Sequence, residues 1–231
     1  MSASGLADAA GFEGKIEIAI VEGDRTTSLR YTNSADSLRI EVIGNDLPNP
    51  VDIIDQKSGT LTILFPQNHS FLRLKPTNAS APTEARPVFP NPGGGMPAIP
   101  PVSMPAIEKS DLKAIGKKEK ILGYACELYE IQQRGETMEI WATGSLIPFH
   151  SYRRNQERHF GPRLLEERWP DLLAAKNLFP LRATLRSENN AESYRFEVKA
   201  ITPEKANDSE KRLFRPPADY IEIPALPFPG R

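Results

Sequence analysis

The stretch FEGKIEIAIVEG, residues 12–23, decides the fold because its side chains alternate between apolar and charged. Phe12, Ile16, Ile18 and Ile20 share one parity, and charged side chains such as Lys15 fill the other. A period of two is typical of a β-strand that buries one face and leaves the other in water. The alternation recurs in SLRIEVIG (37–44), GTLTILFP (59–66), FPLRATLRS (179–187) and ESYRFEVKA (192–200). The sequence therefore predicts a mainly β (α+β) protein.

Short polar clusters separate these segments, among them EGDRTT, NSAD, DQKSG, PQNH and SENNAE. Connections of this length predict hairpins in an antiparallel sheet of about nine strands. Helical patterns are few. GPRLLEERWPDLLAAKN (161–177) predicts two short helices divided at Pro170, and EKSDLKAIGKK (108–118) predicts another, with Ser110 as N-cap and Gly116 as stop. A sheet with one apolar face must cover it, and the region around Trp169 is the natural plug.

The 231 residues are enough for one large domain, which we expect to span residues 12–221. Residues 1–11 are expected to form a disordered leader, and residues 222–231 a C-terminal tail. A Pro/Gly-rich insertion at residues 76–106 interrupts the strands. This insertion is either a flexible surface loop or a segment that packs over a groove through its few apolar side chains, Val88, Phe89, Met96, Ile99 and Met104.

Composition excludes several classes of function. The formal net charge of −1 gives no field to recruit nucleic acid, so no nucleic-acid partner is expected. The sequence contains no run of 18 apolar residues, so no transmembrane segment is expected. The first residues show no signal peptide, although SGLADAAG is similar to a leader left after signal cleavage. Cys126 is the single cysteine, which excludes an intrachain disulfide, and its apolar strand favours core packing over a reactive thiol.

No pattern predicts catalytic chemistry, a cofactor or a metal. His69, His150 and His159 are too widely spaced for a metal site. Asp52 and Asp55 are interpreted as caps of the turn at DQKSG rather than as an acid pair, because aspartate favours turns. We therefore expect no enzymatic activity.

Six segments occur in an order that resembles a family of uncharacterised bacterial exported proteins, itself similar to the LolA/LolB-type carriers of outer-membrane lipoproteins. They are FEGKIEI, VDIIDQKSGTLTILFPQNHSFLRL, EKILGYACELYEI, GETMEIWAT, FPLRATLRS and LFRPPADY. The resemblance covers residues 12–75 and 107–221. It implies a curved antiparallel sheet, a half-barrel, wrapped around short helices, and a periplasmic location.

The resemblance also implies a non-enzymatic protein that binds a lipid, or the acyl chain of a lipoprotein, in an apolar cavity. The expected lining is Ile16, Ile18, Ile20, Leu38, Ile40, Leu61, Ile63, Phe65, Trp141, Trp169 and Phe196. The alternative is that these residues are plain core, in which case Trp169, Leu172 and Leu173 would fill the concave face and leave no cavity. Arg153 and Arg154 are expected to meet a headgroup at the mouth of the cavity. Trp141 has the opposite parity to Met138 and Ile140, and the sequence leaves open which of these faces is inside. The alternative function is an envelope protein–protein interaction module that uses the sheet or the Pro-rich segment.

Overall fold

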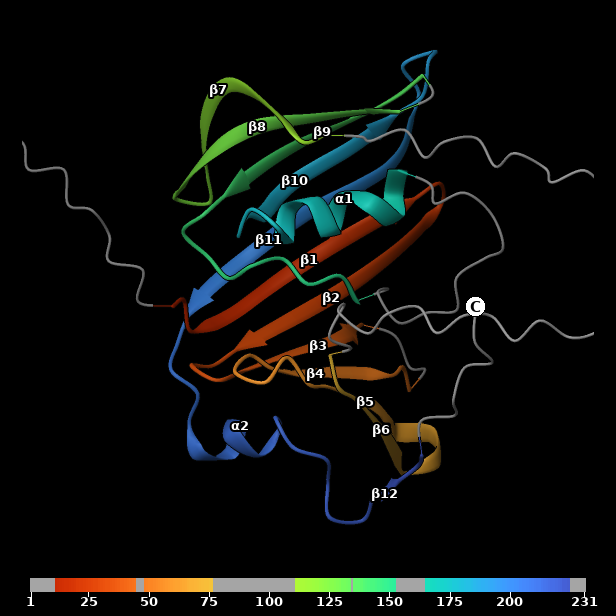
Figure 1. Ribbon diagram of the computed structural model, residues 1–231, viewed down its shortest axis with the longest axis vertical. Coiled ribbons are helices and arrows are strands. Elements are labelled where there is room, and N and C mark those ends of the chain that lie inside the picture. Colours follow the sequence, from red (N-terminus) through yellow and green to blue (C-terminus); the bar gives the residue numbers. More distant parts are fainter. Residues whose placement is uncertain (1–10, 45–47, 77–110, 134, 153–164, 225–231) are drawn as a thin grey trace, which may run out of the picture.

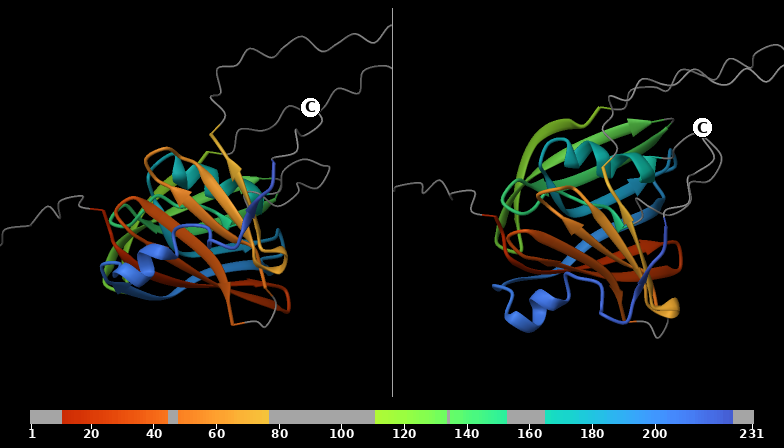
Figure 2. Two further views of the ribbon diagram at one scale, coloured as in Figure 1. Left: turned by 90° about the horizontal axis from the view of Figure 1, so that it is seen from below. Right: turned by 60° about the horizontal axis from the view of Figure 1, so that its bottom comes forward.

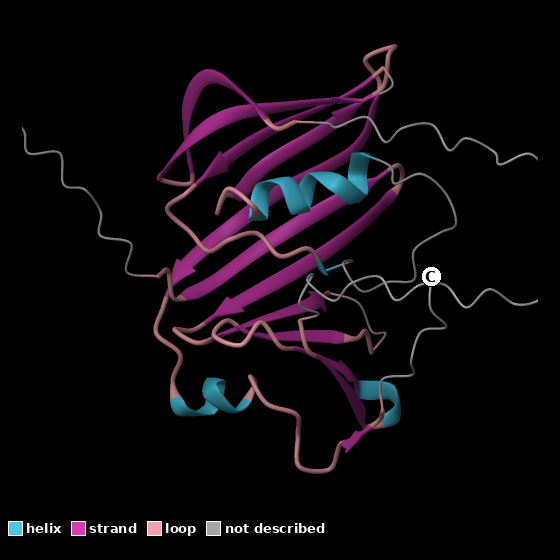
Figure 3. Ribbon diagram, viewed as in Figure 1, coloured by secondary structure: helices cyan, strands magenta, loops and turns pink. Residues whose placement is uncertain are grey.

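The computed structural model describes residues 11–44, 48–76, 111–133, 135–152 and 165–224. The expectations for the leader, for most of the insertion, for the end of the tail and for Arg153, Arg154 and His159 lie outside these residues. Twelve strands and three short helices form the described part, and strands dominate (Figure 3).

The strands follow one another along the chain as β1 (Gly14–Glu22), β2 (Arg25–Asn33), β3 (Ser37–Ile43), β4 (Val51–Asp55), β5 (Leu61–Phe65), β6 (Ser70–Leu74), β7 (Lys113–Ile121), β8 (Tyr124–Gln133), β9 (Glu136–Thr143), β10 (Phe179–Arg186), β11 (Glu192–Pro203) and β12 (Ile221–Glu222). The helices are the 3₁₀ turn η1 (Pro66–Asn68), α1 (Leu165–Ala174) and α2 (Asp208–Arg212).

All twelve strands belong to one sheet, in the order β12-β6-β5-β4-β3-β2-β1-β11-β10-β9-β8-β7. Strand β1 pairs antiparallel with both β2 and β11, so it joins the strands before the insertion to those after it. Every pairing is antiparallel except the short parallel contact of β12 with β6. The described strands do not close into a barrel, since β7 and β12 lie at opposite ends of the sheet.

The sheet curves around α1, which lies on its concave side across β10, β11 and β1 (Figures 1 and 2). Trp169 and Leu173 of α1 are at most 1% exposed and pack into the main core. The alternating residues of the central strands form the opposite wall, and Ile16, Ile18 and Ile40 are almost completely buried there. The predicted half-barrel with a helical plug is confirmed.

A second, smaller core lies on the convex face of β4, β5 and β6. It consists of Val51, Ile53, Leu64 and Phe71. Phe214 and Tyr220 pack against it from the C-terminal arm, which we define as residues 204–224. This arm contains α2 and ends in β12.

Three expectations about local structure are wrong. Residues 113–121 form strand β7 instead of a helix, because pairing with β8 outweighs a weak helical pattern. Gly116, with φ of 78°, lies where the register of β7 shifts against β8. Pro170 lies inside α1 rather than dividing two helices, and the strands number twelve rather than nine. The division into leader, single domain and tail stays a prediction.

Candidate functional site

The candidate site is the part of the concave face that lies beyond the helical plug. Strand register places one residue from each of β2 to β6 side by side in a row across this face. The row runs Tyr31, Ile40, Asp52, Ile63 and Leu72. Since directly opposed residues of neighbouring strands point to the same side of a sheet, all five side chains share the concave face.

The centre of the concave face is filled by aromatic side chains. Phe149, from the segment before α1, stacks on Trp169 with ring centroids 5.1 Å apart and meets Phe196 edge-on at 5.4 Å. Tyr31 and Phe179 complete the cluster. Six of the residues expected to line a cavity are buried in this main core: Ile16, Ile18, Leu38, Ile40, Trp169 and Phe196. Ile20 packs against it half-buried.

Five apolar side chains on the same face are packed differently. Leu61, Ile63 and Phe65 of β5 and Leu72 and Leu74 of β6 belong to neither core of the described residues. Ile63 is 8% exposed, and the other four are half-buried. We call these five residues the β5–β6 strip. The strip contains three of the predicted lining residues, whereas six others lie in the filled centre of the concave face.

Asp52 interrupts the apolar row directly beside the strip. It is 4% exposed, and its cross-strand neighbours are Ile40 and Ile63. Within the described part of the chain, no hydrogen bond or ion pair reaches its carboxylate. Burial raises the pKa of Asp52 to about 7, because an apolar surrounding disfavours the charged form. Asp52 is not a turn cap, whereas Asp55 is one, accepting the backbone N–H groups of Lys57 and Ser58.

Two tyrosines lie close to Asp52. Tyr31 donates its hydroxyl proton to the carbonyl of His150 at 2.6 Å, and Tyr152 donates to the carbonyl of Pro50 at 2.8 Å. Burial, together with the charge of Asp52, raises the pKa of Tyr152 to about 12. Burial and the neighbouring Tyr194 and Asp52 raise the pKa of Tyr31 well above its usual range. Both hydroxyls therefore stay protonated at neutral pH.

Trp141 lies on the other face of the sheet. Met138 and Ile140 are fully buried on the concave side, which settles the parity that the sequence left open. Trp141 is half-buried opposite Arg182, whose guanidinium carbon lies 5.7 Å from the centre of its ring. Trp141 is therefore not brought together with the other expected lining residues.

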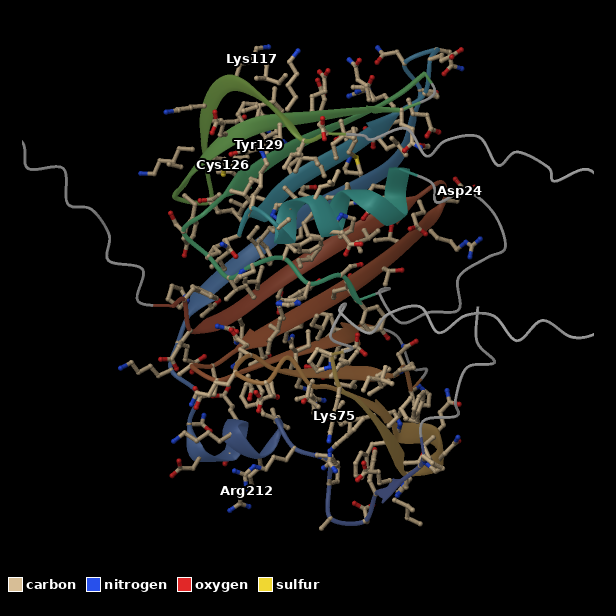
Figure 4. The ribbon with its side chains drawn as sticks, in the orientation of Figure 1. Asp24, Lys75, Lys117, Cys126, Tyr129 and Arg212 are labelled. Atoms are coloured by element: carbon tan, nitrogen blue, oxygen red, sulfur yellow. The ribbon has the colours of Figure 1, made fainter. Side chains whose placement is uncertain are left out.

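Cys126 is packed in the main core, as expected, and is 2% exposed. Burial is the main cause that raises the pKa of its thiol, which weakens it as a nucleophile. Figure 4 places it on β8, away from the β5–β6 strip, and shows Lys117 pointing outward from β7. None of the helices in the described part of the chain is long and apolar enough to cross a membrane.

The sequence reasoning missed Tyr31 and Tyr152 and assigned Asp52 to a turn. Strand β2 carries an alternating pattern at Leu29 and Tyr31 that would have identified it as half-buried. Strand β4 carries no such signal, because cores on both faces hide the alternation in VDIID.

A family model described as a domain of unknown function (DUF4412) matches residues 103–220, just over half of the chain. The chain belongs to this family. Membership of DUF4412 confirms the expectation of an uncharacterised family. No curated protein matches the sequence.

Solved structures similar to this DUF4412 chain share little sequence with it. PNGF-II is 16% identical over 93% of this chain and 32% of its own, with a TM-score of 0.47, so the chain spans about a third of PNGF-II. An uncharacterized conserved protein from Thermus thermophilus is 10% identical over 92% and 91%, with a TM-score of 0.47. A putative outer membrane lipoprotein-sorting protein domain from Vibrio parahaemolyticus is 13% identical over 87% and 89%, with a TM-score of 0.30. Scores below 0.5 extend no neighbour's activity to this chain.

Proposed function

We propose that this protein is a non-enzymatic binding protein of the bacterial periplasm that holds a lipid, or the acyl chain of a lipoprotein, on its concave face. The observation that carries the proposal is the β5–β6 strip. Its five apolar side chains lie on the concave face and yet belong to neither core of the described residues. Apolar surface left outside a core is typical of a binding site for an apolar partner.

The acyl chain of the proposed ligand lies beside the helical plug rather than in the middle of the half-barrel. Trp169 and Leu173 already fill the centre of the concave face, so a ligand there would have to displace α1. On β5 and β6, neither core of the described residues fills the space over the strip. Of the expected lining residues, Leu61, Ile63 and Phe65 therefore make the proposed contacts.

Burial of the chain supplies the affinity. Each methylene group taken out of water contributes about 0.8 kcal/mol, so the roughly fifteen methylenes of a 16-carbon chain contribute on the order of 12 kcal/mol before costs. Ordering of the chain and loss of its translational freedom reduce this value by several kcal/mol. The expected affinity is therefore micromolar, which suits reversible carriage.

The test is native mass spectrometry of the full chain, purified from bacterial cells without denaturant, followed by organic extraction and lipid analysis. We expect an acyl species near stoichiometric amount in the wild type. Leu72→Asp and Leu61→Asp should each lose it, because a charge on the strip opposes burial of the chain. Leu213→Asp is the matched control, since Leu213 is 45% exposed on the C-terminal arm. An apo mass that also shows no uptake of added fatty acid or phospholipid would overturn the proposal.

The second candidate function is an envelope interaction module in which residues 76–106 tether a partner. The observation that favours it is the composition of this insertion, since proline-rich segments dock on other proteins with little loss of entropy. Deletion of residues 78–104 distinguishes the two functions. It should abolish capture of the partner if the insertion is a tether, and should leave lipid uptake in place if the strip is the site.

A further inference from the structure

The second feature of the concave face is a set of hydrogen-bond acceptors that no donor among the described residues satisfies. Asp52 is buried in an apolar row with no hydrogen bond or ion pair from the described residues. An ionised carboxylate in such a place lowers the stability of the fold unless something pairs with it. Its position next to Ile63 puts this carboxylate at the edge of the β5–β6 strip.

The two nearby hydroxyls cannot satisfy the carboxylate. Each tyrosine has one hydroxyl proton, and those of Tyr31 and Tyr152 are committed to the carbonyls of His150 and Pro50. Both phenol oxygens therefore offer only lone pairs to their surroundings. Strand register places Tyr31 two strands away from Asp52 on the same face, and Tyr152 bonds the carbonyl of Pro50, two residues before Asp52.

A site made of hydrogen-bond acceptors favours a ligand that carries hydrogen-bond donors. A primary ammonium group brings three N–H donors and a positive charge, and a charge-assisted hydrogen bond to a carboxylate is about twice as strong as a neutral one. A carboxylate or phosphate headgroup would instead be repelled by Asp52. A hydroxyl could donate one proton but would bring no charge.

We propose that the concave site takes an alkyl chain ending in a primary ammonium group, with the chain on the β5–β6 strip and the ammonium paired to Asp52. This inference rests on the proposed function, since it names the headgroup of the same ligand. Pairing with Asp52 requires a positively charged headgroup, whereas pairing with Arg153 and Arg154 would require a negatively charged one. The charge of the bound headgroup therefore distinguishes recognition by Asp52 from recognition by the two arginines.

The pairing makes binding dependent on pH. An alkylammonium keeps its charge to about pH 10, so Asp52 is the group that changes between pH 6 and 8. With its pKa at about 7, the ionised fraction rises from about one tenth to about nine tenths over this range. Affinity should therefore rise about tenfold. Tyr31 and Tyr152 face Asp52 but stay neutral here, and the charged Arg39 and Glu41 of β3 point to the convex face.

The experiment compares three probes with one chain length: dodecylammonium, dodecanol and dodecanoate. Calorimetric titrations of the full chain at pH 6 and pH 8, below the micelle concentrations of the two ionic probes and the solubility limit of dodecanol, give the affinities. We expect dodecylammonium to bind about tenfold more tightly than dodecanol at pH 8, and dodecanoate to bind most weakly. The advantage of dodecylammonium should shrink about tenfold at pH 6.

Asp52→Asn removes the charge while keeping the size of the side chain. It should abolish the preference among the three headgroups and the pH dependence. Asp24→Asn, in the exposed β1–β2 turn, is the matched control and should behave as the wild type (Figure 4). Equal affinities for the three probes, or a preference for dodecanoate, would overturn the inference and leave the apolar site standing. Binding of none of the probes would instead contradict the proposed function itself.

Discussion

At the scale of single residues, Asp52 combines a charge with an apolar environment. Its raised pKa means that the folded protein holds a proton that the unfolded chain releases above pH 4. The unfolded state then binds fewer protons than the native state, so stability falls as pH rises from about 4 to about 7 and stays low above that. A shift of about three units corresponds to about 4 kcal/mol in all.

We predict that Asp52→Asn flattens this pH dependence. Between pH 5 and pH 8 the wild type should lose about 3 kcal/mol of unfolding free energy that the variant keeps, because the amide has no charge to bury. Urea unfolding followed by circular dichroism at the two pH values measures the difference. A wild type and variant with the same pH dependence would mean that Asp52 is solvated or paired in solution.

Asp55 and Asp52 differ in how far their environments can be predicted from the sequence. Asp55 was correctly assigned to the turn, because an Asx turn is a local pattern within four residues. The place of Asp52 depends on which strands flank β4 and which faces they bury. That information lies in residues far apart in the chain, such as Ile40 and Ile63.

At the scale of elements, α1 is the plug that fills the centre of the concave face. Trp169 stacks on Phe149 and meets Tyr194 and Phe196 edge-on. Its buried indole N–H has no hydrogen-bond partner among the described residues, so the packing of the ring is the main contribution of this residue. The alternating strands and the plug were predictable from local periodicity. Strand β7 was not, because an exposed edge strand rich in lysine carries no buried face to alternate.

We predict that Trp169→Ala lowers the unfolding free energy by about 3–5 kcal/mol, since it empties the centre of the core. Trp169→Phe should cost clearly less, because the ring stacking is kept and the lost N–H had no partner. Trp141→Ala, at the half-buried tryptophan on the opposite face, is the comparison and should cost less than Trp169→Ala. Thermal and urea unfolding give the values. Equal losses for the two alanine variants would contradict the assignment of α1 as the plug.

The C-terminal arm covers the convex face of strands β4 to β6. The backbone N–H groups of Ile221 and Ile223 donate to the carbonyls of His69 and Phe71, an ion pair joins Arg73 to Glu222, and a hydrogen bond joins the His69 ring to Asp219. The arm therefore caps the edge of β6 and seals the second core.

We predict that removal of residues 213–231 exposes β6. Hydrogen exchange of the amides of residues 70–74 should become much faster, because both the edge partner and the cover of the second core are lost. Phe214→Ala should give a smaller effect in the same direction. The amides of β1, whose neighbours are β2 and β11, serve as the internal control. Unchanged protection in β6 would show that the arm is not part of the folded unit.

At the scale of the whole molecule, the two faces of the sheet are covered by different segments. The concave face holds the plug at its centre and the β5–β6 strip beside it, and the convex face of β4 to β6 is sealed by the arm. The curved sheet was anticipated through the family resemblance, since periodicity alone predicts strands but not their order. The split of the predicted lining between core and strip depends on where α1 lies, and no local pattern in the sequence reveals that.

The most direct test of the account is photo-crosslinking with an alkyl chain that carries a diazirine near its end, followed by trypsin digestion and mass spectrometry. Cleavage after Lys57 and Arg73 releases residues 58–73, which contain four of the five residues of the strip. We predict that the adduct concentrates in this peptide and that Leu72→Asp removes it, while Leu213→Asp leaves it unchanged. An adduct spread evenly over the chain, or one confined to peptides of β7 to β9, would contradict the assignment of the concave strip as the binding site.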